Sequence, residues 1–196
     1  MSKHLGNVVD PDELVALYGA DTVRLAVLYA ARPQRSLNWS DSAVLRCHRY
    51  LTQVWEYSLS RLAAARAADT DGAAVEGAGA AARDDTEHFR RKLLQEWCPT
   101  AVERITADME GLEMHTAVRD LMRLFDRIKD FEKRVTARQG ELSQADSDAL
   151  IDALTVLVQL LGPFTPHLAE ELWLAFGHEE HGAQTPWPVV SFQVPA

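Results

Sequence analysis

The chain has 196 residues, 47% hydrophobic and 25% charged, a composition that supports a folded core and excludes general disorder. Its formal net charge of −9 excludes a protein that coats nucleic acid through overall positive charge, so any such contact needs a local basic face. Cys47 and Cys98 fit no metal spacing and no disulfide scaffold, which predicts no metal site and a reducing, cytoplasmic setting. No signal-peptide core and no membrane-spanning run is present.

The N-terminal segment predicts a loop over residues 1–9 and then a short helix. Asp10 has the chemistry of an N-cap, Pro11 follows at the first helical position, and Glu13 stands where a capping box needs it. Gly19 supplies a C-cap. This segment is therefore expected to be a small loop-and-helix appendage.

A second helix over about 21–31 and the turn-rich connector "RPQRSLNW" lead to Ser40, which is expected to cap a long helix over about 41–66. Its apolar residues keep helical spacing: Val44, Cys47, Leu51, Val54, Trp55, Leu59 and Leu62. The next stretch, about 67–84, is small, punctuated by glycine and poor in large apolar groups, and so predicts a flexible loop.

The remaining periodic segments are each bounded by a cap or a helix breaker. They are a helix from about Thr86, interrupted or kinked at Pro99 and stopped by Gly111; one over about 115–138; one over about 144–161, capped by Ser143 and broken at Gly162-Pro163; and one over about 166–176. Only the final "VVSFQV" alternates like a strand. The fold class predicted is all-α: a helical bundle over 41–196, preceded by the appendage over 1–40.

The helix over 115–138 offers the clearest candidate binding surface. At about 100° per residue, its apolar residues fall on one side: Ala117, Leu121, Leu124, Phe125, Ile128, Phe131 and Val135. Basic residues gather on the other side: Arg119, Arg123, Arg127, Lys133, Arg134 and Arg138. This basic ridge is either an ordinary solvated face or a surface that tracks phosphates, for which arginine is suited; Asp120 and Asp130 dilute it. Arg46 and Arg49 are further candidates.

Three smaller sequence features are further candidates for binding or core roles. The "HEEH" at 178–181 lacks a second ligand pair and predicts a surface loop. Trp55, Trp97 and Phe125 are expected to be core anchors. Ser2 and Lys3 stand on a loop flanked by Gly6, from which a lysine could reach nucleotide phosphates; from the residues alone, a frayed start explains them equally well.

A resemblance over nearly the whole chain gives these features a context. The opening "MSKHLGN" is similar to the signature loop of class I aminoacyl-tRNA synthetases, with Met1, Ser2 and Lys3 matching its second to fourth positions. Further segments resemble the bacterial-type leucyl-tRNA synthetases: "YGADTVRL" at 18–25, "LNWSDSAV" at 37–44, "CHRYLTQVW" at 47–55, "LLGPFTPHLAEELW" at 160–173 and "TPWP" at 185–188. The bundle is thus expected to be that family's anticodon-binding-type, tRNA-docking domain.

The sequence also departs from the family pattern. His4 replaces the final serine of the signature, and Leu5 stands where a basic residue is common. The first lysine of the signature would precede Met1, so the chain is expected to be a portion that lacks the Rossmann-type catalytic domain and the inserted editing domain.

The resemblance implies ATP-dependent attachment of leucine to its tRNA in the intact enzyme. Lys3 would stabilise the pyrophosphate leaving group, Ser2 would also contact ATP, and Mg²⁺ would accompany the nucleotide. The fragment alone is expected to bind no cofactor and to be inactive, with leucine tRNA and the remaining synthetase domains as partners. Two alternatives stay open: one half of a split synthetase, or a stand-alone helical module that binds RNA or protein.

Overall fold

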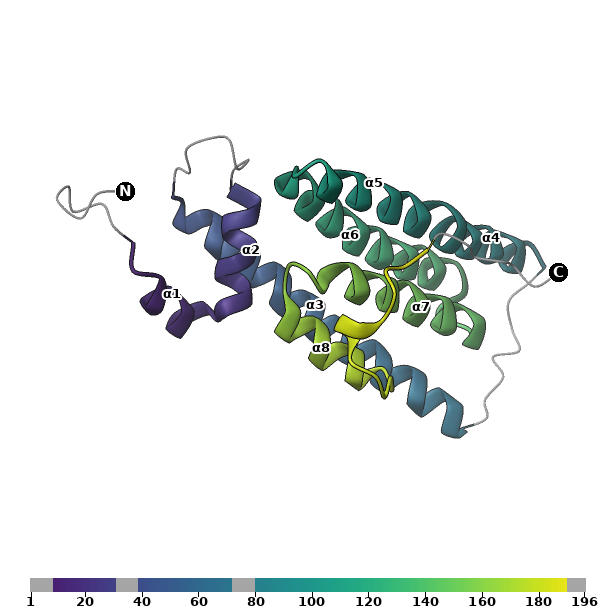
Figure 1. The fold of residues 1–196 in the computed structure, drawn as a ribbon. Coiled ribbons are helices and arrows are strands. Elements are labelled where there is room, and N and C mark those ends of the chain that lie inside the picture. The colour runs from purple at the N-terminus through teal and green to yellow at the C-terminus, as the bar shows by residue number, and fades with distance from the viewer. Residues whose placement is uncertain (1–8, 31–38, 72–79, 190–196) are drawn as a thin grey trace.

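The computed structural model describes residues 9–30, 39–71 and 80–189. Its elements, shown in Figure 1, are α1 (Pro11–Tyr18), α2 (Ala20–Ala30), α3 (Asp41–Asp71), α4 (Ala80–Arg91), the π-helix η2 (Lys92–Trp97), α5 (Cys98–Glu110), α6 (Met114–Gln139), α7 (Gln144–Leu161), α8 (Pro166–Ala175) and the short 3₁₀ turn η3 (Gly182–Gln184). Within these ranges there is no strand, which confirms the all-α prediction.

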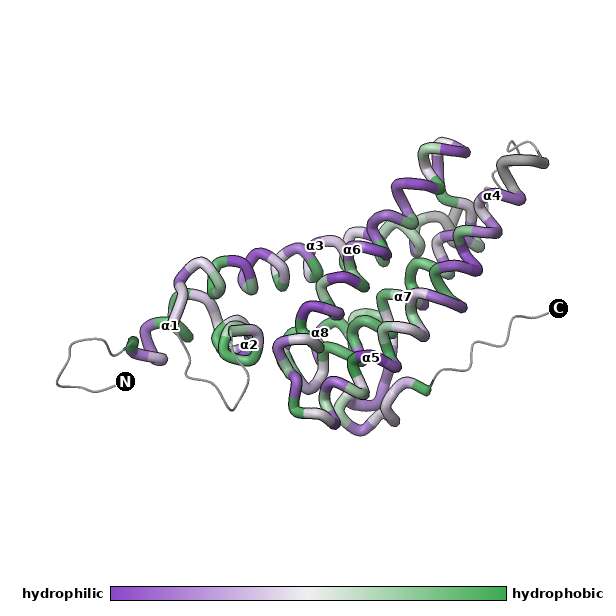
Figure 2. The backbone as a smooth tube through the Cα atoms, turned by 90° about the horizontal axis from the view of Figure 1, so that it is seen from above, coloured by the Kyte–Doolittle hydropathy of each residue, from purple (hydrophilic) through white to green (hydrophobic). Residues whose placement is uncertain are grey.

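The core forms where α2, α4, α5 and α7 pack around α6, and α3 and α8 pack against α7. Figure 2 shows apolar and polar residues alternating along these helices. All seven residues assigned to the apolar side of α6 are at most 2% exposed, which confirms that prediction. The largest side chains with almost no exposure include Leu93 of η2, Ile105 of α5 and Phe131 of α6. A helix whose stripe is buried this completely can present only its opposite side to a ligand.

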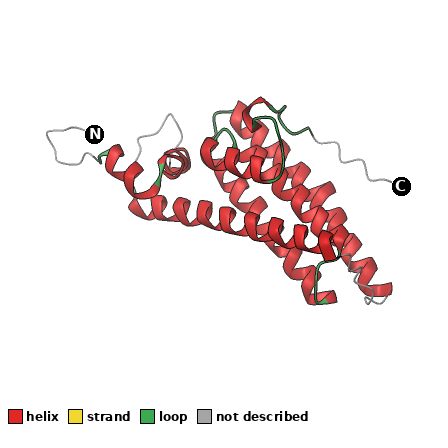
Figure 3. Ribbon diagram, turned by 90° about the horizontal axis from the view of Figure 1, so that it is seen from below, coloured by secondary structure: helices red, strands yellow, loops and turns green. Residues whose placement is uncertain are grey.

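The appendage lies at one end of the long helix α3 (Figures 1 and 3). Asp10 caps α1 as predicted, accepting a hydrogen bond from the Asp12 amide at 2.9 Å, and Gly19 ends the helix at φ 83°. None of the residues of α1, all of which are described, is buried. By contrast α2 packs against α3 and α6, with Leu25 and Ala26 in the core, so the appendage is joined to the bundle through α2.

The expected loop over 67–84 is too long. Helix α3 continues to Asp71 and α4 already begins at Ala80, so helix occupies both ends of that stretch; residues 72–79 lie outside the described residues. The stretch is rich in alanine, the residue with the highest helix propensity. The lack of large apolar groups predicts a loop, but the helix propensity of alanine is sufficient to extend both helices into this stretch.

Gly111 stops α5 as predicted, whereas the chain accommodates Pro99 without ending the helix. Pro99 does not end its helix, because the preceding turns widen into η2, where the Cys98 amide bonds to the Leu93 carbonyl five residues earlier. Proline lacks an amide donor and crowds the carbonyl four residues before it, and a wider turn accommodates both constraints. Helix α5 ends at Glu110, where Leu112 rather than Gly111 takes the left-handed conformation, at φ 58°.

The expected core aromatics separate into three environments. Phe125 is 1% exposed, as predicted, whereas Trp97 is half-buried and Trp55 is 37% exposed. The prediction that Trp55 is a core anchor is therefore wrong. Its side chain lies at the edge of the apolar stripe of α3, where it is partly open to solvent. Among the described residues no helix is both long and apolar enough to cross a membrane, and the strand-like C-terminal residues from 190 onward are outside the description.

A buried carboxylate ties three helices together near the start of α7. Asp146 is fully buried and forms a capping box with Ser143, the predicted N-cap. It also accepts hydrogen bonds from Arg90 of α4 at 3.2 Å and from Gln139 of α6 at 2.7 Å. A buried charge is stable only when its oxygens are paired in this way, so Asp146 fixes the relative positions of α4, α6 and α7.

Replacing Asp146 by alanine should therefore lower the free energy of unfolding by about 2–4 kcal/mol, because the carboxylate half of the capping box is lost and Arg90 keeps a desolvated charge without its partner. Urea denaturation followed by circular dichroism measures this change. The matched control is Asp148→Ala, which removes an exposed carboxylate of the same helix that bonds only locally to Gln144 and should cost less than about 1 kcal/mol. Equal effects of the two substitutions would contradict the role given to Asp146.

Candidate nucleic-acid interface

Helix α6 presents its basic ridge to solvent because its other side is buried. Arg119, Arg123, Arg127, Lys133, Arg134 and Arg138 are all exposed. From Arg119 to Arg138 the ridge extends over about 28 Å at the α-helical rise per residue. The structure thus places all six predicted residues of the ridge along one side of a single helix.

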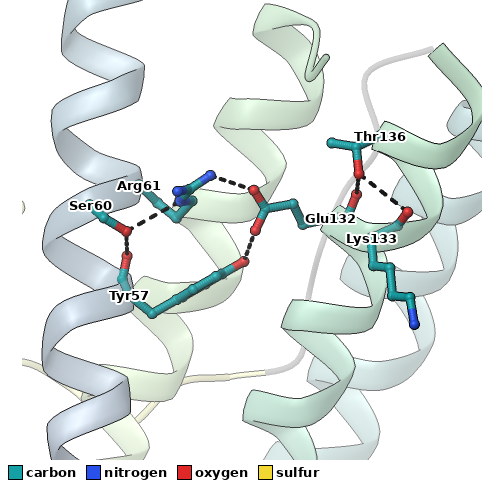
Figure 4. Close-up of polar contacts among 6 residues, drawn as sticks. All are labelled: Tyr57, Ser60, Arg61, Glu132, Lys133 and Thr136. Atoms are coloured by element: carbon teal, nitrogen blue, oxygen red, sulfur yellow. Dashed lines mark hydrogen bonds and ion pairs between the residues drawn. The ribbon is translucent and has the colours of Figure 1, made fainter. Parts of the chain in front are cut away.

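A polar clamp between α3 and α6 sets the rotation of the ridge (Figure 4). Glu132 accepts a hydrogen bond from the Tyr57 hydroxyl at 2.6 Å and forms an ion pair with Arg61. Both partners lie on α3. Lys133 follows Glu132 in sequence, and its side chain points away from the clamp (Figure 4). Because consecutive residues lie about 100° apart around a helix, fixing Glu132 against α3 turns Lys133 toward the ridge.

The clamp is partly desolvated, and this affects the chemistry of its tyrosine. Burial, followed by the hydrogen bond to Glu132 and the charge of that carboxylate, raises the pKa of Tyr57 well above its ordinary value, while Arg61 opposes the rise. The phenol therefore stays protonated and remains a donor to Glu132. This keeps the α3–α6 contact intact across the neutral range.

The first half of the ridge contacts both acidic and aromatic neighbours. Arg123 forms an ion pair with Asp120 one turn earlier. Arg127 lies over the ring of Trp97, with its guanidinium carbon 4.9 Å from the ring centroid, a cation–π geometry. Arg119 contacts the Thr116 hydroxyl at 3.5 Å. Each side chain is held near the surface and still exposes its guanidinium.

The second half of the ridge is more completely paired. Arg134 bonds to Asp130 at 2.7 Å and lies 5.8 Å from the ring of Phe89. Arg138 bonds to Asp85 of α4 at 2.9 Å. The dilution by Asp130 expected from the sequence is therefore direct neutralisation, and α4 contributes a further carboxylate that helical periodicity within α6 could not reveal.

The two candidates on α3 behave differently from each other. Arg46 reaches the Tyr29 hydroxyl at 3.5 Å, and Tyr29 lines the same surface hollow as Arg119. Arg46 is thus brought to the Arg119 end of the ridge. Arg49 bonds to the carbonyl of Leu45 in its own helix at 3.4 Å, and no contact connects it to the ridge within the described ranges.

Sequence reasoning missed Arg104 on α5. A hollow of about 210 Å³ between α5 and α6 is lined by Arg104, Arg123, Arg127 and Trp97, together with Glu96 and Asp120. Arg104, Arg119 and Arg123 also border an adjacent hollow of about 360 Å³. Only the pairing of α5 with α6 places Arg104 beside the ridge, so periodicity within one helix gives no signal for it.

Burial and neighbouring charges affect one carboxyl group at the second hollow. Burial, followed by the nearby Asp120 and Glu113 carboxylates, raises the pKa of Asp108, which lines the second hollow. Its ionised form is therefore disfavoured relative to an isolated aspartate. A concave, arginine-lined surface with an adjacent indole can accept phosphate oxygens through charge-assisted hydrogen bonds and can stack against flat groups.

The remaining candidates lie elsewhere. Ser2 and Lys3 fall outside the described residues. The "HEEH" at 178–181 forms a surface loop, in which His178 stacks on Trp173 with ring centroids 3.7 Å apart and His181 bonds to Glu170 at 2.6 Å. Across the described part of the chain no cluster of three or more histidine, cysteine or acidic side chains is arranged to hold a metal ion.

Comparisons with known protein families match two segments of the chain. Residues 94–195, just over half of it, match the model described as the anticodon-binding domain of tRNA ligase. Residues 1–40 match the model described as class I tRNA synthetases (I, L, M and V). The boundary of the second match coincides with the expected end of the appendage.

Two leucine–tRNA ligases are similar in sequence to almost the full length of the chain. The leucine–tRNA ligase of Marinomonas sp. (strain MWYL1) is 33% identical over 191 residues, which is 97% of this chain and 21% of that protein. The leucine–tRNA ligase of Desulfatibacillum aliphaticivorans is 36% identical over 189 residues, 96% of this chain and 20% of that protein. The chain thus spans about a fifth of the length of these relatives.

A solved structure is similar over the same extent. It is the ternary complex of Agrobacterium radiobacter K84 agnB2 LeuRS with tRNA and LeuAMS, which matches with a TM-score of 0.73 and 29% identity and covers 97% of this chain and 22% of that one. The likeness therefore includes α1 and α2 as well as the bundle.

The α3–α6 clamp predicts a specific dependence of stability on alkaline pH. Because the pKa of Tyr57 is raised in the folded state, the unfolded tyrosine ionises first, and stability contributed by the neutral phenol is lost as pH rises above about 10. Between pH 10.5 and 12 the free energy of unfolding should fall less steeply in Tyr57→Phe than in the parent chain, by up to about 1.4 kcal/mol per pH unit. Urea titrations at several pH values measure both slopes, and parallel slopes would contradict this account.

Proposed function

The chain belongs to the family of anticodon-binding domains of tRNA ligases, and on this basis we propose that it is the tRNA-docking part of a leucine–tRNA ligase. In this proposal the bundle binds the body of leucine tRNA, and the N-terminal segment carries the ATP-contacting signature loop. The leucine–tRNA ligases that match almost the full chain support the choice of amino acid. The complex of the similar LeuRS with tRNA supports RNA as the partner.

The observation that carries the proposal is the arginine-lined surface between α5 and α6. Arg104, Arg119, Arg123 and Arg127 converge there from two helices around adjoining hollows. The net charge of the whole chain is −9, so this concentration of guanidinium groups is a local exception. Phosphate contacts of this kind position a nucleic acid without reading its bases, which fits recognition of a folded RNA by shape and backbone.

The activity proposed for the intact protein is the ATP-dependent attachment of leucine to its tRNA in the cytoplasm. ATP enters as its Mg²⁺ complex, and leucyl-adenylate forms as pyrophosphate leaves. Lys3 is proposed to stabilise the negative charge that develops on pyrophosphate, and Ser2 to contact the same phosphates. This electrostatic role requires donors held in a preorganised cleft, and the remaining domains, in the same polypeptide or in a split partner, would supply that cleft.

The docking surface predicts weak tRNA binding that falls with salt, because each phosphate contact releases counterions. We expect Arg123→Glu with Arg127→Glu to lower the affinity of the chain for leucine tRNA at low salt by at least about tenfold. The slope of log affinity against log salt should become shallower by about two units. Fluorescence anisotropy with labelled leucine tRNA and with a tRNA for another amino acid measures affinity, slope and preference together.

The matched control for this experiment is Arg91→Glu. Arg91 is also exposed, but it lies about 160° around α4 from Phe89, whose ring contacts Arg134 of the ridge. The control should leave the affinity within about twofold. If the double variant binds as the parent does, the surface is not the docking site. If leucine tRNA is bound no better than the other tRNA, the selectivity depends on the remaining domains.

The division of labour predicts the outcome of an exchange assay. The 196-residue chain alone should show no leucine-dependent exchange of pyrophosphate into ATP, whereas the complete ligase should show it. In the complete ligase, Lys3→Ala should lower the exchange rate by about 10²–10³-fold, the usual effect of removing one group that stabilises charge in the transition state. Exchange by the isolated chain above a no-enzyme blank would contradict the proposal.

A further inference from the structure

Two segments that are far apart in the sequence meet at one buried carboxylate. Asp21 lies at the start of α2, in the N-terminal segment, and is 9% exposed. Its two oxygens contact the first turn of α8: Oδ1 lies 2.9 Å from Nδ1 of His167, and Oδ2 accepts a hydrogen bond from the Leu168 amide at 2.8 Å. Arg24, one turn further along α2, lies 3.6 Å from the same carboxylate.

Helix α8 depends on this carboxylate because its own sequence does not cap it. Thr165 occupies the N-cap position, but within the described chain its side chain makes no capping hydrogen bond and instead bonds back to the Leu161 carbonyl at 3.3 Å. Pro166 follows at the first helical position and has no amide to satisfy. Leu168 is the third helical residue, whose amide an N-cap side chain ordinarily satisfies. Asp21 therefore takes the place of the N-cap from another part of the fold.

The carboxylate of Asp21 is well suited to the N-terminus of α8 for two reasons, its charge and the direction of its hydrogen bonds. A carboxylate at a helix N-terminus is stabilised by the helix dipole, more strongly when the site is partly buried. Its hydrogen bonds are also directional, whereas the apolar contacts of Leu25 and Ala26 beside it depend on buried area and not on orientation. The carboxylate can therefore fix an angle between α2 and α8 that apolar packing alone leaves adjustable.

We propose that Asp21 is a positioning residue that sets the orientation of the helical bundle relative to the segment carrying Lys3. The proposal rests on the function proposed above, in which tRNA docks on the bundle while ATP chemistry occurs at the other end of that segment. In this role Asp21 acts without direct contact to ATP or tRNA. It acts through α8, so that RNA held on the bundle reaches the reaction centre in the correct place.

The functional test separates the two half-reactions in the complete ligase. Asp21→Ala should leave leucine-dependent pyrophosphate exchange within about twofold, since that reaction needs no tRNA. The same variant should lower kcat/KM for aminoacylation by about tenfold or more, because misplacement of bound RNA is costly to the transfer step. Asp21→Asn retains an oxygen for the Leu168 amide and should recover part of the loss.

The matched control is Asp10→Ala. Asp10 is likewise a helix-capping aspartate of the N-terminal segment, but among the described residues it caps its own helix alone, through the Asp12 amide. It should leave both reactions within about twofold. Equal losses of both reactions in Asp21→Ala, or loss of neither, would overturn the proposal.

A structural test keeps the inference independent of catalysis. Spin labels on cysteines introduced at Val27 of α2 and Leu174 of α8, which are 43% and 45% exposed, report the distance between these helices; Cys47 and Cys98 are fully buried and are protected from labelling. In the 196-residue chain, Asp21→Ala should shift or broaden the distance distribution by more than about 2 Å, the size of an ordinary helix shift. Asp10→Ala should leave it unchanged.

The combined outcomes distinguish two failures. If the complete wild-type ligase neither exchanges pyrophosphate nor charges leucine tRNA, the proposed function fails, and the distance measurement alone decides whether Asp21 positions the bundle. If the wild type performs both reactions but the distance distribution of Asp21→Ala matches that of the parent chain, the positioning role fails while the function stands. A circular dichroism spectrum equal to that of the parent shows that each variant is folded.

Discussion

The burial of one side of α6 is the constraint on which the rest of the molecule depends. The apolar stripe of this helix contacts α5, α7, α4 and α2, and Glu132 binds it to α3 through Tyr57 and Arg61. With so much of its circumference covered, the helix has one remaining orientation in which its charges can be hydrated. The exposed arginines therefore result from the core packing as much as from any requirement for a ligand.

Intramolecular pairing gives this surface a graded character. The arginines near the N-terminal end of α6 border the hollows between α5 and α6, where Arg123 pairs with Asp120, whereas Arg134 and Arg138 pair with Asp130 and Asp85. Exposed ion pairs contribute little to stability, from near zero to about 1 kcal/mol, so an incoming phosphate can replace a carboxylate at small cost. The same pairs hold the long side chains in defined positions and so reduce the entropy lost when a ligand binds.

Helical periodicity was enough to place the apolar and basic sides of α6, because both lie within one element whose geometry is known in advance. The capping residues Asp10 and Ser143 were equally predictable, since each cap acts on its own helix. What the sequence could not provide was every contact made between helices. Arg104 joins the basic surface only through packing of α5 on α6, and Asp85 neutralises Arg138 from α4.

Errors in helix length had a local cause of a different kind. The alanine-rich segment after Leu62 lacks the large side chains that mark a buried stripe, yet its propensity carries α3 to Asp71. Pro99 was taken as an interruption because a proline ordinarily breaks the regular ladder of hydrogen bonds. The chain accommodates this proline by forming η2, and it continues along nearly the same axis into α5 (Figure 1).

That widened turn has an arithmetic consequence for the chain. A π-helical turn holds one residue more than the hydrogen-bonded ring of an α-helix, so η2 acts as an inserted residue between two regular helices. Because η2 absorbs this residue, the regular helices before and after it keep the relative rotation of one continuous α-helix. Removing a single residue from η2 would therefore return it to a regular α-helix while α4 and α5 keep the faces that they now bury. Sequences that share this fold should accept a one-residue difference in length at η2 more readily than within α4 or α5.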